Sequence, residues 1–158
     1  MSKNKELVAK WFDAVWGANY NPTIIRELAA DDIVFNYPMH GEFHGPESVI
    51  AMLTDFRESF EDLNFWATGE MIEEGNKVVA TWDGGGSHTG KAFTASPFGG
   101  LLPANSGKVV RFTGTTIIEI ENGKVKSEAG QEGAIDALLQ MGLVKKQVND
   151  LSSLHYDI

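Results

Sequence analysis

The spacing of the apolar residues changes near residue 61, and this change limits the folds open to the chain. Before it, apolar side chains recur at helical spacing, most clearly over residues 7–16. After it, the segments 63–86 and 107–129 read as strand pairs around turns at residues 74–76 and 122–123. Helices followed by antiparallel strands predict an α+β domain. We expect a cone-shaped half-barrel, in which a curved, mostly antiparallel sheet wraps on the N-terminal helices around an apolar interior.

Local signals place the remaining elements. Asn21 and Gly45 each precede a proline, which predicts the start of a second and a third helix, because proline is favoured at the first helical position. A strand is expected over residues 31–38, where a proline ends it. A last helix is expected from Glu132 toward Val144.

The segment 91–106 reads as a long loop with several apolar residues, which suits a cover over a site. The chain otherwise shows no repeat and no linker. We therefore expect a single α+β domain over residues 1–144 and a C-terminal tail over residues 145–158.

Charge and composition exclude several kinds of partner. The net charge of −9 argues against a nucleic-acid backbone and against an anionic membrane surface as partners. The chain has no cysteine, which excludes disulfides, thiol catalysis and cysteine–metal sites. No segment reads as a signal peptide or a membrane span, so a cytoplasmic location is expected.

Three segments, taken in order, carry a family resemblance: "FHGPESV", "GSHTG" and the strand containing "ENGKV". In this order and spacing the chain resembles the SnoaL-like polyketide cyclases, of the nuclear-transport-factor-2-like superfamily, over about residues 5–143. The resemblance implies a cone-shaped pocket for a small apolar molecule, homodimers, and acid–base chemistry without a metal or cofactor. The fold hosts many functions, so it does not imply one reaction.

The chain departs from this family at the catalytic positions. The resemblance places the aspartate of the cyclases at Gly130, a polar residue that precedes it at Glu128, and a partner histidine at Thr116. The base of the related ketosteroid isomerases falls at Tyr37. The departure argues against the family's aldol-type cyclisation and against steroid isomerisation.

The register of the last hairpin decides where Glu128 points. A two-residue type I′ turn at Asn122-Gly123 makes opposed residue numbers add to 245, whereas a three-residue bulged turn makes them add to 246. One residue of slip exchanges the two faces of a strand. The resemblance implies that Thr116 and Gly130 both face the pocket, and only the bulged register allows this. We therefore predict that Glu128 points inward.

A carboxylate inside an aromatic cone loses solvation, which raises its pKa. Glu128 is therefore a candidate general acid or base near neutral pH. The alternative is that Glu128 forms an ion pair with Lys126, Arg111 or another strand residue.

Two further residues are candidate catalytic groups. His88, in "GSHTG", could donate a hydrogen bond to a ligand carbonyl, or satisfy local backbone groups instead. Tyr37 could polarise a ligand oxygen as a neutral donor, or pack in the core.

Other residues are candidate ligand contacts. His40 could lie at the cone mouth, although an exposed loop position is the alternative for it and for His44. Gln131 could contact the ligand or begin the last helix. The four histidines have no tight ligand spacing, so no metal site is expected. The remaining candidates for the pocket wall, which ordinary core packing explains equally well, are Phe35, Trp66, Trp82, Phe112 and Thr116.

Two functions follow from these residues. The first is a cofactor-free enzyme that acts on a small apolar, carbonyl-bearing molecule, by cyclisation, isomerisation, dehydration or ester hydrolysis. The second is a non-catalytic module for ligand binding or dimerisation, which the glycine at the expected base position favours.

Overall fold

A computed structural model describes residues 1–92 and 106–145 of the chain. Most of the predicted loop and the tail beyond residue 145 lie outside the described residues. The elements, in chain order, are α1 (Lys3–Val15), α2 (Pro22–Leu28), β1 (Ala29–Tyr37), β2 (Gly41–His44), α3 (Pro46–Ser59), β3 (Asn64–Glu74), β4 (Lys77–Ser87), β5 (Val109–Glu121), β6 (Lys124–Glu132) and α4 (Ala134–Gln140).

The sequence signals for the helices are confirmed by their caps and buried faces. Ser2 caps α1 by accepting the Lys5 N–H, and Val8, Trp11 and Phe12 form part of its buried face. The Asn21 side chain accepts two backbone N–H groups at the start of α2, where Pro22 follows it. These local choices place the two N-terminal helices where the sequence predicted them. None of the helices in the described part of the chain is long and apolar enough to cross a membrane.

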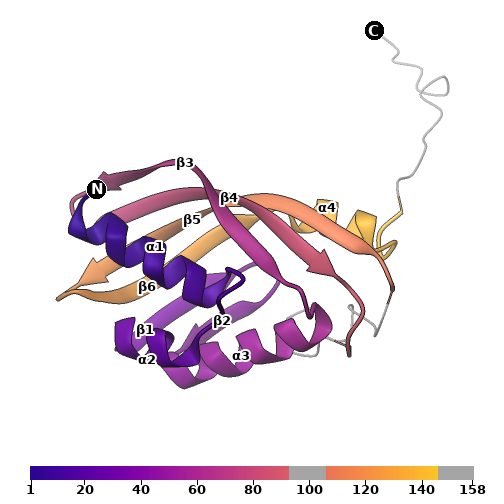
Figure 1. The fold of residues 1–158 in the computed structure, drawn as a ribbon, viewed down its shortest axis with the longest axis horizontal. Coiled ribbons are helices and arrows are strands. Elements are labelled where there is room, and N and C mark those ends of the chain that lie inside the picture. Colours follow the sequence, from indigo (N-terminus) through magenta and orange to yellow (C-terminus); the bar gives the residue numbers. More distant parts are fainter. Residues whose placement is uncertain (93–105, 146–158) are drawn as a thin grey trace, which may run out of the picture.

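The strands form one six-stranded sheet in the order β2-β1-β6-β5-β4-β3. Every neighbouring pair is antiparallel except β1 and β6, which run parallel. The sheet is curved and open, and its long strands arch over α1, while α2 and α3 lie beside β1 and β2 (Figure 1). The expected α+β architecture is confirmed.

The structure differs from the sequence-based expectation at two places. The segment after Tyr37 forms a short strand, β2, that no sequence pattern indicated. Gln131 and Glu132 do not begin the last helix, because β6 continues through Glu132 and α4 begins at Ala134. Ladder bonds to β5 hold both residues in the strand: Thr115 faces Gln131 and Gly114 faces Glu132.

Candidate active site

The register of the β5–β6 hairpin is set by a bulge inside the strand. Asn122 and Gly123 both have positive φ values, 52° and 73°, as a type I′ turn requires. Glu121 therefore pairs with Lys124, contrary to the predicted three-residue turn. The pairing then shifts by one residue between Glu119 and Ile120, and the extra residue on β6 is Lys126.

Beyond this bulge the pairs have the predicted register. Ile118 faces Glu128 and Thr116 faces Gly130. Glu128, Thr116 and Ile118 are completely buried on the inner face of the sheet. The predicted orientation of Glu128 is therefore confirmed, although the extra residue lies in the strand and not in the turn.

The Glu128 carboxylate accepts three hydrogen bonds from aromatic side chains. Trp11 Nε1 donates to Oε2 at 2.5 Å, and Trp16 Nε1 donates to Oε1 at 2.7 Å. The Tyr37 hydroxyl also donates to Oε1, at 2.5 Å. All three partners are donors, which is the arrangement that an ionised carboxylate requires.

Trp82, Thr116 and Tyr37 form a chain of hydrogen bonds in which each group donates toward Glu128. Trp82 Nε1 donates to Thr116 Oγ1 at 2.8 Å. Thr116 Oγ1 lies 2.6 Å from the Tyr37 hydroxyl, which gives its own proton to Glu128, so Thr116 is the donor in that contact. The Tyr37 hydroxyl and the indole N–H groups of Trp16 and Trp82 therefore already have hydrogen-bond partners within the protein.

Burial raises the pKa of Glu128 above its ordinary value, and the hydrogen bonds from Tyr37, Trp16 and Trp11 oppose that rise. The predicted alternative, an ion pair, is wrong for both cations that were named. Lys126 contacts Asp32, and Arg111 pairs with Asp83 at 2.7 Å. Burial, together with the Glu128 charge, also raises the pKa of Tyr37 well above its ordinary value.

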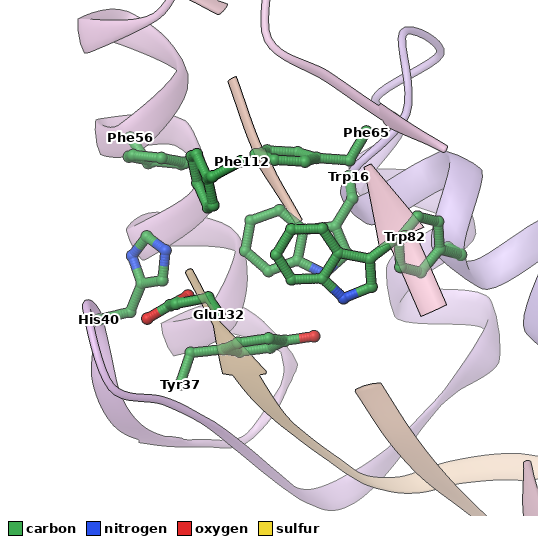
Figure 2. A pocket seen from close by; sticks show the side chains of 9 residues that line it. Trp16, Tyr37, His40, Phe56, Phe65, Trp82, Phe112 and Glu132 are labelled. Carbon is green, nitrogen blue, oxygen red and sulfur yellow. The ribbon is translucent and has the colours of Figure 1, made fainter. Parts of the chain in front are cut away.

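A cavity lies next to this network, enclosed by rings from the helices and from the inner face of the sheet (Figure 2). The space is narrow, about 10 Å³, and admits about one water molecule without movement of side chains. Glu128 lies behind the wall of the cavity and not in it. The lining residues are Phe12, Trp16, Tyr37, His40, Phe56, Phe65, Trp82, Phe112 and Glu132.

The two titratable lining groups other than Tyr37 are Glu132 and His40. Glu132 accepts the Met39 backbone N–H, and burial raises the pKa of its carboxyl to about 7. Burial lowers the pKa of His40 to about 3, so this imidazole is neutral near pH 7. Figure 2 shows the Glu132 carboxylate on the His40 side of the cavity, and the indole nitrogens of Trp16 and Trp82 toward the Tyr37 hydroxyl.

The glycine at the family's aspartate position has a structural reason. A Cβ atom on Gly130 would lie 2.1 Å from Tyr37 Cε1, far inside contact distance. The Tyr37 ring therefore occupies the space into which an aspartate at this position would project. The acids on this face of β6 stand two residues to either side, at Glu128 and Glu132.

The structure brings some predicted site residues together and separates others. Tyr37, Thr116 and Glu128 form one hydrogen-bonded network, and Trp82 and Phe112 line the adjoining cavity. Phe35 is buried and packs on the Trp16 and Tyr37 rings, so it belongs to the core and not to the lining. His40 is buried in the cavity wall, whereas His44 is exposed and contacts Glu42.

Three predicted site residues lie elsewhere. Trp66 pairs with Asp83 on the outer side of the sheet, where it is 43% exposed and its ring lies under Arg111. Its assignment to the pocket wall is therefore wrong by one residue, because the neighbouring Phe65 is the ring that lines the cavity. Gln131 is exposed on the same outer side, opposite Thr115.

His88 is buried beyond the end of β4, where it stacks on Phe60 at 4.9 Å. Its Nδ1 accepts the Ser106 N–H, which matches the alternative of satisfying local groups. It does not line the cavity that contains Glu132.

The sequence patterns did not indicate the two indole donors to Glu128 or the acid inside the cavity. Trp11 and Trp16 were assigned only to a helical apolar stripe, although tryptophan needs a partner for its N–H when it is buried. Glu132 was assigned to a helix start. Its alternation with Glu128 and Gly130 along β6 was the signal that could have placed it on the inner face.

Comparison with known proteins agrees with this architecture. A family model described as SnoaL-like polyketide cyclase matches residues 6–141. The chain belongs to the SnoaL-like polyketide cyclase family. This membership suggests a cofactor-free role of the cyclase or isomerase type. No curated protein gave a significant match to this SnoaL-like chain.

Solved structures share the fold of this SnoaL-like protein. One is from Jannaschia sp. CCS1, assigned as a SnoaL-like polyketide cyclase, with a TM-score of 0.74, 21% identity and coverage of 90% of this chain and 94% of that one. A second, assigned as a polyketide cyclase, is from Acidithiobacillus ferrooxidans. It has a TM-score of 0.72 and 19% identity, with coverage of 91% of this chain and 97% of that one. A third, from Catenulispora acidiphila, has a ketosteroid isomerase-like fold and is in complex with trimethylamine. It has a TM-score of 0.68 and 19% identity, with coverage of 88% of this chain and 94% of that one. At these identities the likeness shows the fold alone.

Proposed function

We propose that this SnoaL-like protein is a cofactor-free acid–base enzyme of the cyclase or isomerase type, acting on a small, largely apolar, carbonyl-bearing molecule. Glu132 carries the proposal: it is the acid that lines the cavity, and its pKa of about 7 suits proton transfer near neutral pH. Glu128 is assigned to positioning, because its oxygens are bonded to Tyr37, Trp16 and Trp11.

In the proposed reaction, Glu132 removes a proton from the carbon next to the substrate carbonyl. The electron pair moves to the carbonyl oxygen, where the N–H of neutral His40 stabilises the developing charge. Where a double bond adjoins that carbon, protonated Glu132 returns the proton to the far end of the conjugated enolate, which is an isomerisation. Alternatively, the enolate carbon attacks a second carbonyl, whose oxygen then takes the proton from Glu132, which is a cyclisation. Tyr37 has no part as the donor, since its proton is held by Glu128.

The test is exchange of α-protons in a panel of small cyclic ketones in D₂O, followed by NMR. Wild type should accelerate exchange, Glu132→Gln should abolish the acceleration, and Glu70→Gln, at an exposed position on β3, should retain it. Acceleration that survives Glu132→Gln contradicts the proposed role. Ligand binding without any exchange would support the second candidate, a non-catalytic binding module, which Gly130 at the family's base position favours.

We further propose that the protein works as a cytoplasmic homodimer, as the family resemblance implies. Ile117 and Trp66, on the outer side of the sheet, are 48% and 43% exposed, and large apolar side chains there suit contact with a second copy. Light scattering after size exclusion should give a dimer mass for wild type and a monomer mass for Ile117→Asp. A monomer mass for wild type would contradict this.

A further inference from the structure

Most polar hydrogens on the rings that line the Glu132 cavity already have partners in the protein. Apart from the imidazole N–H of His40, which the proposed reaction uses, the N–H and O–H groups on the described lining rings belong to Trp16, Tyr37 and Trp82. The two indole N–H groups and the hydroxyl are bonded to Glu128 or Thr116. What these side chains offer to a ligand is therefore the π face or the edge of a ring.

The rings meet at steep angles and form a box. Phe65 stands at 79° to Trp82, at 70° to Phe112 and at 84° to Trp16, with centroid separations of 5.2, 5.2 and 6.0 Å. Trp16 stands at 78° to Tyr37. These are direct edge-to-face contacts, so the rings support one another and line the narrow space with ring edges and with π faces, and a π face attracts a cation.

The charges around the box have one sign. Glu132 lies in the wall, and Glu128, with three donors on its carboxylate, lies directly behind Tyr37 and Trp16. Among the described residues, no lysine or arginine lines the cavity. The one basic lining group, His40, is neutral near pH 7, because burial makes its protonation costly and it can release the proton. A ligand with a permanent positive charge cannot become neutral by releasing a proton, and its charge would favour the ionised form of Glu132.

We infer that the cavity binds a methylated ammonium group, so that the substrate of this SnoaL-like protein is an amine-bearing molecule held by the aromatic box and Glu132. This inference rests on the proposed function, since it concerns the same cavity. A methylated ammonium suits the site better than a primary one, because it is weakly hydrated and needs few hydrogen-bond acceptors. The narrow space also favours a compact head group, which some of the rings must move to admit.

The experiment compares choline with its neutral isostere, 3,3-dimethylbutan-1-ol, by calorimetry and tryptophan fluorescence at pH 8 and constant ionic strength. The two probes have nearly the same shape and differ in charge. Choline should bind roughly tenfold or more tightly, given the strength of a desolvated cation–π contact. Equal or tighter binding of the alcohol overturns the inference, and so does the absence of saturable choline binding.

Two variants test the two parts of the site. Glu132→Gln should weaken choline several-fold and leave the alcohol unchanged, and Phe112→Leu should weaken choline more than the alcohol. Thermal unfolding confirms that each variant is folded, and Glu70→Gln serves as the control for a lost surface charge. If neither variant changes the choline-to-alcohol ratio, the inference is wrong.

The outcome separates this inference from the proposed function. Loss of the cation preference, with α-proton exchange still dependent on Glu132, overturns only the inference. Choline binding with no exchange in any ketone overturns only the proposed reaction.

Discussion

The raised pKa of Glu132 predicts that Glu132→Gln stabilises the protein, and that the gain depends on pH. In the unfolded chain this carboxyl titrates near its ordinary value of 4.5, whereas in the fold burial raises its pKa to about 7. Between these values the native state holds a proton that the unfolded state has released. Stability from this group is therefore fully present below pH 4.5 and falls as the pH rises toward 7.

The size of the effect follows from the two pKa values. A difference of this size corresponds to about 3 kcal/mol in the free energy of unfolding, and residual exposure of the side chain reduces this to about 2 kcal/mol. Glutamine cannot ionise, but its amide oxygen can still accept the Met39 N–H. Glu132→Gln should therefore match wild type below pH 4.5 and exceed its stability by about 2 kcal/mol at pH 8.

Urea denaturation followed by tryptophan fluorescence at pH 5, 6, 7 and 8 measures the difference. The Glu70→Gln control, which removes an exposed acid from β3, should remain close to wild type throughout. A difference between Glu132→Gln and wild type that is constant from pH 5 to pH 8 would refute the assignment of the raised pKa to this carboxyl. Lower stability of the variant at pH 8 would refute it as well.

Three further outcomes are expected. Gly130→Ala should lower the free energy of unfolding by about 1–3 kcal/mol in urea titrations, because its Cβ meets the Tyr37 ring, and the cost should shrink in a Tyr37→Ala background. Trp11→Phe should lose about 1.5–3 kcal/mol through the missing N–H to the buried carboxylate, whereas Trp66→Phe on the exposed side should change stability by under about 1 kcal/mol in the same assay. α-Proton exchange should rise with pH through an inflection near 7, as Glu132 ionises to act as a base; a flat NMR rate profile would argue against it.

The sequence predicted the fold because its local signals agree with one another. The cap at Asn21, the proline positions and the change from helical to strand spacing all indicate the same α+β order, and the Asn21 cap is found where predicted. The short strand β2 escaped prediction because four residues give too little periodicity to detect. Its ladder with β1, in which Phe35 faces Phe43, depends on partners distant from any local signal.

The candidate site could be predicted only in part. Alternation along the last hairpin placed Glu128 on the inner face, but no sequence signal distinguishes a bulge at Lys126 from one in the turn. Nor can spacing reveal that two indole groups would saturate the carboxylate, since Trp11 and Trp16 reach it from α1 and its C-cap. Tertiary packing decides which buried acid keeps a lone pair for a ligand.

The chain lacks the family's aspartate but keeps an acid in its cavity, and the hydrogen-bond donors along β6 explain how. The Tyr37 ring lies against Gly130 and fills the space of an aspartate there, while the two neighbouring inward positions carry acids with different hydrogen-bond partners. Glu128 receives three donors and anchors the aromatic wall, which directs the polar hydrogens of that wall away from the cavity. Glu132 receives one backbone N–H and remains at the cavity surface. One carboxylate thus holds the polar hydrogens of Tyr37 and Trp16 away from the cavity, while the other stands at the cavity surface, where the proposed reaction needs it.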